Sequence, residues 1–135
     1  MQLQTPERRS LNRARVLLAD DHRAVLEAEI ALLSPDFDVV AAVADGAALV
    51  SEARRLHPDL VVTDITMPIL GGIDALHELR ASGSTKIFVF LTIHAEREFE
   101  ACMEAGALGY VKKSDMQDHL VPAIHAAFAG RPYTP

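Results

Sequence analysis

Short apolar segments alternate with amphipathic helical segments along nearly the whole chain. The run at residues 86–91, Lys-Ile-Phe-Val-Phe-Leu, is almost entirely apolar, which is typical of a strand buried on both faces. By contrast, Val25, Leu26, Ile30 and Leu33 recur at the spacing that places them on one face of a helix. The alternation predicts strands at residues 15–19, 37–43, 60–63, 86–91 and 108–111, each followed by a helix.

Five strand–helix units with short connections imply a parallel sheet with helices on both faces. Right-handed crossovers leave few topologies for such a sheet. The commonest for five units is the flavodoxin-like order, and ligands then bind where the chain reverses direction between the first and third strands. We therefore predict an α/β fold, a flavodoxin-like (βα)5 doubly wound parallel sheet with strand order 2-1-3-4-5. Pro122 fits poorly in the last helix, expected at 115–129, which either starts near Asp118 or bends.

The composition bounds the class of protein. The chain has 135 residues, half of them hydrophobic, but no apolar run near the roughly 20 residues of a membrane span. Residues 1–14 are polar and lack the apolar core of a signal peptide, so we expect a flexible tail on a cytoplasmic protein without membrane contact. The single Cys102 fits a reducing compartment. A net charge of −6 argues against nucleic-acid binding by this segment alone.

Three carboxylates come after the two strands that flank the expected crevice. Asp20 and Asp21 come directly after the first predicted strand, and Asp64 comes after the third. Like charges held so close raise each other's pKa unless a cation neutralises them. Oxygen ligands in a half-open pocket suit Mg²⁺. The pattern therefore predicts a Mg²⁺ site at the carboxyl ends of these strands.

The fourth and fifth strands end in residues that suit phosphoryl transfer. Thr92 offers a hydroxyl and Lys113 an ammonium group, both expected beside Asp64 in the predicted order. A carboxylate next to Mg²⁺ can attack a phosphoryl group and form an aspartyl phosphate, and the transferring group needs positive charge and hydrogen-bond donors. The sequence contains no G-x-x-x-x-G-K-[ST] motif, which disfavours nucleoside triphosphate binding.

These motifs together resemble a response-regulator receiver domain of the NarL/FixJ subfamily, which has LuxR-type helix-turn-helix effectors. The resemblance covers about residues 15–130, nearly the whole chain. Each motif alone is weak, and the four in order at strand ends are specific. They are Leu-Leu-Ala-Asp-Asp-His at 17–22, Asp-Ile-Thr-Met-Pro at 64–68 with Gly72, Leu-Thr at 91–92 and Gly-Ala-Leu-Gly-Tyr-Val-Lys-Lys at 106–113.

The resemblance implies a role for each matching residue. Asp64 resembles the phosphoacceptor, which a sensor histidine kinase phosphorylates in the presence of Mg²⁺. The metal ligands would be the carboxylates of Asp20, Asp21 and Asp64 and the backbone carbonyl of Thr66. Thr92 resembles the switch hydroxyl and Tyr110 the aromatic residue that changes rotamer. Lys113 matches the family lysine, so Asp64, Thr92 and Lys113 would carry the chemistry. The resemblance implies no enzymatic activity other than phosphorylation of the domain's own aspartate from a phosphodonor and its autodephosphorylation.

Two residues depart from the family pattern. Ser114 comes after the family lysine where proline is frequent. Ile93 comes after Thr92 where many relatives have a smaller side chain, and a β-branched residue there predicts restricted access for phosphodonors and slow exchange.

The last residues of the chain resemble a connection to another domain. The run Gly-Arg-Pro-Tyr-Thr-Pro at 130–135 is similar to the linker that precedes a LuxR-type DNA-binding domain. We therefore expect residues 131–135 to begin a linker to an effector domain absent from this chain, so that DNA contact and transcription control belong to that domain. A naturally stand-alone receiver is the alternative. The first and fifth helices, or the fourth and fifth, are plausible homodimer surfaces.

Other interpretations of the same residues stay open. The run Asp20-Asp21-His22 could cap the next helix, because Asp is a good N-cap residue. A receiver-like interaction module that works without phosphorylation is a second possibility. An aspartate-nucleophile phosphatase is a third, but such enzymes carry a second Asp two residues after the nucleophile, where this chain has Thr66.

Overall fold

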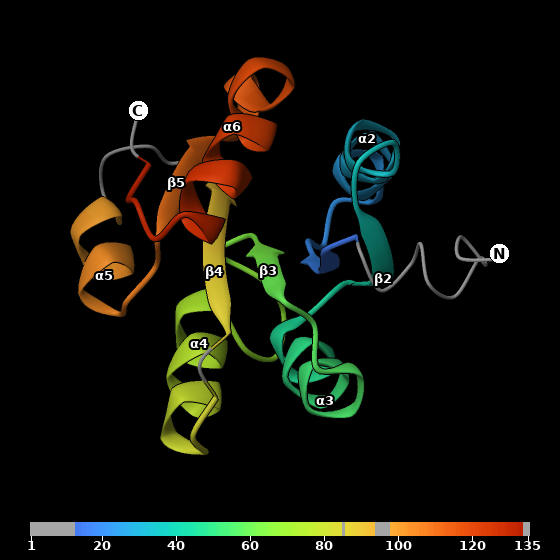
Figure 1. Ribbon diagram of the computed structural model, residues 1–135. Coiled ribbons are helices and arrows are strands. Elements are labelled where there is room, and N and C mark those ends of the chain that lie inside the picture. Colours follow the sequence, from blue (N-terminus) through green and yellow to red (C-terminus); the bar gives the residue numbers. More distant parts are fainter. Residues whose placement is uncertain (1–12, 85, 94–97, 134–135) are drawn as a thin grey trace, which may run out of the picture.

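The computed structural model describes residues 13–84, 86–93 and 98–133. Within them, five parallel strands form one sheet in the order β2-β1-β3-β4-β5, which confirms the predicted topology (Figure 1). The strands are β1 (Arg15–Ala19), β2 (Asp38–Val43), β3 (Leu60–Thr63), β4 (Ile87–Thr92) and β5 (Gly109–Lys112).

Helices cover both faces of the sheet (Figure 1). One apolar core lies between the sheet and α3, α4 and α5, and a second lies between the sheet and α2 and α6. The central strands β1, β3 and β4 are buried almost throughout, which explains their near-continuous apolar sequence. The helices are α2 (Arg23–Leu33), α3 (Gly46–Leu56), α4 (Gly72–Ala81), α5 (Phe99–Glu104) and α6 (Met116–Phe128), with a 3₁₀ turn, η1 (Lys113–Asp115), before α6.

The observed element bounds differ from the predicted ones at several ends. Strand β4 continues to Thr92 and β5 to Lys112, one residue beyond the predicted ends. Helix α6 begins at Met116, two residues before the expected start near Asp118, and Pro122 lies in its second turn. The sequence predicts the fourth helix over residues 95–105, and residues 95–97 of it lie outside the described residues. The same holds for residues 1–12 of the tail and 134–135 of the predicted linker.

The strand register aligns the carboxyl ends that carry the predicted site. Ala19 of β1 pairs with Thr63 of β3, and Thr63 pairs in turn with Phe90 of β4. The residues directly after β1 and β3 therefore emerge side by side. No helix among the described residues is long and apolar enough to cross a membrane.

The segment after α6 returns to the sheet. Tyr133 forms a parallel bridge with Gly109 on the outer side of β5. The Tyr110 N–H donates to the Tyr133 carbonyl at 3.0 Å, and the Tyr133 N–H donates to the Leu108 carbonyl at 2.9 Å. Part of the segment predicted as linker therefore adds to the edge of the sheet.

Candidate phosphoacceptor and metal site

Asp20 and Asp64 lie at the adjoining ends of β1 and β3. The Asp64 N–H donates to the Ala19 carbonyl at 2.9 Å, so the strand pairing continues into the site. Both side chains are buried, with 1% of Asp20 and 4% of Asp64 exposed. Two acids so placed require a positive partner, because burial disfavours an uncompensated charge.

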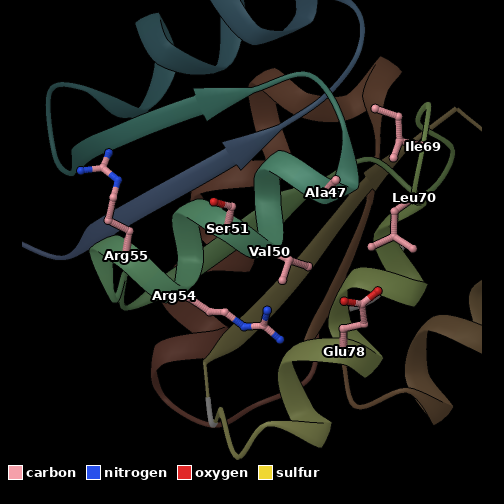
Figure 2. A pocket seen from close by; sticks show the side chains of 8 residues that line it. All are labelled: Ala47, Val50, Ser51, Arg54, Arg55, Ile69, Leu70 and Glu78. Carbon is pink, nitrogen blue, oxygen red and sulfur yellow. The ribbon is translucent and has the colours of Figure 1, made fainter.

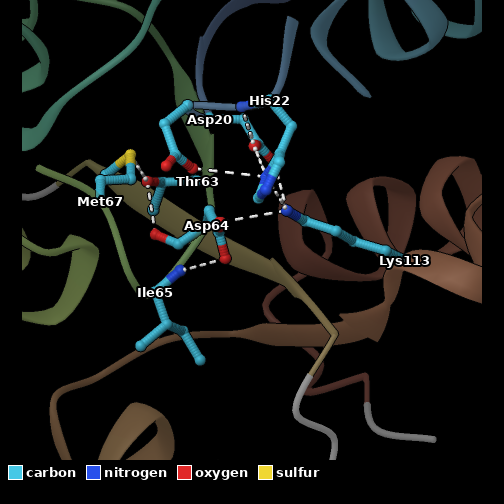
Figure 3. A network of polar contacts seen from close by, with 8 residues as sticks. Asp20, His22, Thr63, Asp64, Ile65, Met67 and Lys113 are labelled. Atoms are coloured by element: carbon cyan, nitrogen blue, oxygen red, sulfur yellow. Dashed lines mark hydrogen bonds and ion pairs between the residues drawn. The ribbon is translucent and has the colours of Figure 1, made fainter. Parts of the chain in front are cut away.

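Lys113 supplies that partner from the start of η1. Its Nζ lies 2.8 Å from Asp20 Oδ2 and 3.0 Å from Asp64 Oδ2 (Figure 3). Burial lowers the pKa of Lys113, but the hydrogen bonds to Asp20 and Asp64 outweigh this effect and the pKa is raised. The ammonium group is therefore firmly charged and holds the ends of β1, β3 and β5 together.

The Asp64 carboxylate is fixed at both oxygens. Oδ1 accepts the Ile65 backbone N–H at 2.7 Å, and Oδ2 accepts from Lys113 (Figure 3). Burial raises the pKa of Asp64, with Lys113 opposing that shift. A carboxylate held in one orientation can attack an electrophile, and the neighbouring lysine can offset the negative charge of an anionic group such as a phosphoryl group.

His22 completes the acidic cluster, although it was not among the predicted metal ligands. Its Nδ1 lies 3.0 Å from Asp20 Oδ1 and 3.4 Å from Asp21 Oδ1. One possible ligand atom from each of Asp20, Asp21, His22 and Asp64 lies within 4.8 Å of the others. Two buried carboxylates, of Asp20 and Asp64, and the exposed carboxylate of Asp21 fit Mg²⁺, which takes oxygen ligands and keeps several waters.

The capping interpretation of the first acidic pair does not describe this turn. His22 is the N-cap of α2, and no side-chain cap bond is formed. Instead the His22 N–H donates to Asp20 Oδ1 at 2.8 Å. Asp20 therefore shapes the turn into α2 with one oxygen while it contacts Lys113 with the other.

The remaining predicted residues surround this centre. Thr92 is the buried last residue of β4 and pairs in register with Lys112. Thr66 is exposed in the loop after Asp64. Tyr110 is fully buried in β5 and packs edge-to-face on Phe99 of α5, with ring centroids 5.3 Å apart. The structure thus brings Asp20, Asp21, Asp64 and Lys113 into one cluster and leaves Tyr110 on the α5 side of the sheet.

Gly72 permits the close approach that shapes the loop behind Asp64. A Cβ atom at this position would lie 2.1 Å from the Asp64 carbonyl oxygen. The Gly72 N–H donates to the Ile65 carbonyl at 2.8 Å, and Thr63 Oγ1 donates to the Asp64 carbonyl at 2.9 Å. The main chain at Asp64 and Ile65 is therefore held by Gly72 and Thr63.

A further acid, missed from the sequence, lies behind the site. Glu29 of α2 is 1% exposed, and neither carboxylate oxygen has a hydrogen-bond partner among the described residues. Burial, followed by the charge of Asp20, raises the pKa of Glu29 to about 9. Glu29 is therefore protonated at neutral pH. The signal in the sequence was its position one turn from both Val25 and Leu33, on the apolar side of the helix.

A hollow on the described surface lies away from the acidic cluster. A shallow depression of about 640 Å³ between α3 and α4 is lined by Arg54, Leu70 and Glu78 among others (Figure 2). Ile69 at its rim is 82% exposed and has φ of 71°, a rare conformation for a β-branched residue. None of the predicted site residues lines this depression, so it is separate from the acidic cluster.

Comparison with known proteins assigns the family. The model of the response regulator receiver domain matches residues 16–125. The chain belongs to this family, as its motifs predicted.

Curated relatives of the chain include response regulators. The nitrate/nitrite response regulator protein NarP of Escherichia coli is 34% identical over 118 residues, which cover 85% of this chain and 55% of NarP. The chain spans about half the length of the curated relatives it matches.

Two solved structures show the same fold. A LuxR family two-component response regulator from Aurantimonas sp. SI85-9A1 has a TM-score of 0.84 and 38% identity, covering 90% of this chain and 89% of that one. The isolated receiver domain of RcsB from Salmonella enterica serovar Typhimurium, solved with the phosphomimetic BeF₃⁻, has a TM-score of 0.83 and 25% identity, covering 92% and 94%.

Proposed function

We propose that Asp64 is the phosphoacceptor of a two-component signalling protein and that a sensor histidine kinase is its donor. The observation that carries this proposal is the buried Asp64 carboxylate, fixed by the Ile65 N–H and by Lys113 beside two further acids. A carboxylate oxygen attacks the phosphorus of a phosphohistidine, the P–N bond breaks and the imidazole leaves with a proton. Asp64 becomes an acyl phosphate.

Each neighbouring residue has a role in this step. Asp20, Asp21 and the Thr66 carbonyl, together with Asp64, would hold Mg²⁺, which supplies charge neutralisation for the incoming phosphoryl oxygens. Lys113 is close enough to exchange its contact with Asp64 for one with a phosphoryl oxygen. Thr92, at the buried end of the neighbouring strand, would donate its hydroxyl to another.

The consequence of phosphorylation is a shift between two conformations of the domain. The added charge would draw Thr92 inward and change the packing of Tyr110 against Phe99, which alters the surface formed by α5, β5 and α6. Homodimerisation through α2 and α6, or through α5 and α6, fits this scheme.

The longer relatives support a further part of the proposal. Residues 15–130 would form the receiver, residues 1–14 a tail and residues 131–135 the start of a linker to a DNA-binding effector domain. Control of transcription would then belong to the longer protein. Cytoplasmic location fits a domain that takes its phosphoryl group from a kinase.

Acetyl phosphate gives a direct test. With Mg²⁺ present, intact-mass measurement should find one added phosphoryl group that is stable to acid and released by base. Asp64→Asn should remove the labelling. Asp74→Asn in α4 is the matched control, because Asp74 is not part of the acidic cluster, and it should label like the original chain. Equal labelling of Asp64→Asn would refute the assignment, and no labelling of any variant would favour a phosphorylation-independent module.

A further inference from the structure

The outer edge of β5 and the exposed side of α6 together hold the segment that leaves the domain. Tyr133 forms two backbone hydrogen bonds, one with Tyr110 of β5 and one with Leu108, the residue just before β5. Its hydroxyl lies 2.6 Å from His119 Nδ1 on α6, and the two rings pack with centroids 6.0 Å apart. The position of Tyr133 therefore depends on two elements at once.

We propose that this edge is a docking site for an extended segment, that Tyr133 occupies it in the resting domain, and that activation at Asp64 releases Tyr133. The docking is inferred from the contacts of Tyr133 and does not require phosphorylation. The release rests on the proposed phosphorylation of Asp64.

The site has the features of strand addition. Edge strands present unpaired backbone groups to an incoming segment, and such a segment gains its affinity from main-chain hydrogen bonds and its specificity from side-chain pockets. Here Tyr133 packs against the apolar core that contains Val111 and α6. A cavity of about 230 Å³ adjoins it, lined by Tyr110, Lys112 and His119 among others. An aromatic residue in an extended segment fits this edge.

Lys113 connects the docking site with the acidic cluster. It begins η1, which joins β5 directly to α6, and its ammonium group contacts Asp20 and Asp64. Tyr133 contacts both β5 and His119 of α6, so its position depends on how β5 and α6 lie relative to each other. If Lys113 exchanged its contact with Asp64 for another, η1 would move and both contacts of Tyr133 would be disturbed. A single bridge with two backbone hydrogen bonds is weakly held, so it opens with a low local free energy.

The Tyr110 amide reports on the docking directly, because its N–H donates to the Tyr133 carbonyl. Hydrogen exchange followed by NMR should find this amide protected in the full chain. Tyr133→Ala should speed its exchange about tenfold or more, the factor for one ordinary hydrogen bond. Arg131→Ala is the control, because Arg131 bonds to the Ala126 carbonyl through its backbone N–H. Equal exchange in Tyr133→Ala and the full chain would overturn the docking site.

The release is tested with Mg²⁺ and beryllium trifluoride. Their binding, seen as Asp64-dependent shifts at Lys113, should speed Tyr110 exchange, and by reciprocity Tyr133→Ala should bind beryllium trifluoride more tightly. Binding without faster exchange would overturn the release and leave the proposed function intact. Absence of binding would overturn the release together with the proposed function, while the Tyr133→Ala comparison still decides the docking.

Discussion

Glu29 gives the sharpest prediction, because its burial links folding to a proton. The carboxyl group is buried without a hydrogen-bond partner among the described residues, and its pKa is raised from 4.5 to about 9. Between these values the folded chain binds a proton that the unfolded chain releases. Its contribution to stability is therefore complete below pH 4.5 and is lost as the pH rises toward 9.

Replacing Glu29 with Gln removes this proton while nearly keeping the size of the side chain. The loss of stability amounts to about 1.4 kcal/mol per pH unit inside the window. From pH 5 to pH 7 the advantage of Glu29→Gln over the original chain should thus grow by about 3 kcal/mol. Shifts at Asp64 and Lys113 are shared by both chains and largely cancel in the difference.

Urea denaturation at several pH values between 5 and 9, in a chelator, measures this difference. Glu27→Gln is the matched control, because Glu27 is exposed on the same helix and should show no pH-dependent advantage. A difference between Glu29→Gln and the original chain that stays flat with pH would refute the buried, protonated state.

Two further predictions concern the loops around the site. Gly72→Ala should cost about 3 kcal/mol in urea denaturation and slow acetyl phosphate labelling, because the added methyl group would lie 2.1 Å from the Asp64 carbonyl oxygen; unchanged stability and labelling would contradict the close packing. Ile93→Ala should label faster than the original chain, with stability unchanged to within about 0.5 kcal/mol, because Ile93 is 62% exposed after Thr92; an equal labelling rate would remove Ile93 as a barrier to phosphodonors.

The sheet and the acidic cluster were predictable because they depend on local pattern. Strand and helix periodicities differ clearly, and parallel strands bring their carboxyl ends to one edge, so Asp20 and Asp64 had to meet once the order was known. The exact ends of β4 and β5 were not predictable, because Thr92 and Lys112 are polar and end their strands through pairing with each other.

The docking of Tyr133 could not be predicted for a different reason. A single residue that bridges to a strand shows no alternation of apolar and polar positions. The side-chain partner of Tyr133, His119, lies fourteen residues earlier, on a helix. The Gly and Pro residues at 130–135 indicate a linker. Its docking depends on the edge of β5, which becomes known only with the fold. Long-range edge pairing of this kind leaves no local signal.

Charge balance links Glu29 with the acidic cluster of Asp20, Asp21 and Asp64. Lys113 carries one positive charge and already contacts Asp20 and Asp64. A third ionised carboxyl group nearby would add repulsion to the cost of burial, and the raised pKa of Glu29 reflects both causes, burial first. The fold thus keeps Glu29 neutral by binding a proton. The carboxylates of Asp20, Asp21 and Asp64 lie close enough together to hold a divalent cation, and Asp21 gives the cluster its exposed side. A cation bound there would offset the negative charge that otherwise repels an anionic phosphoryl donor.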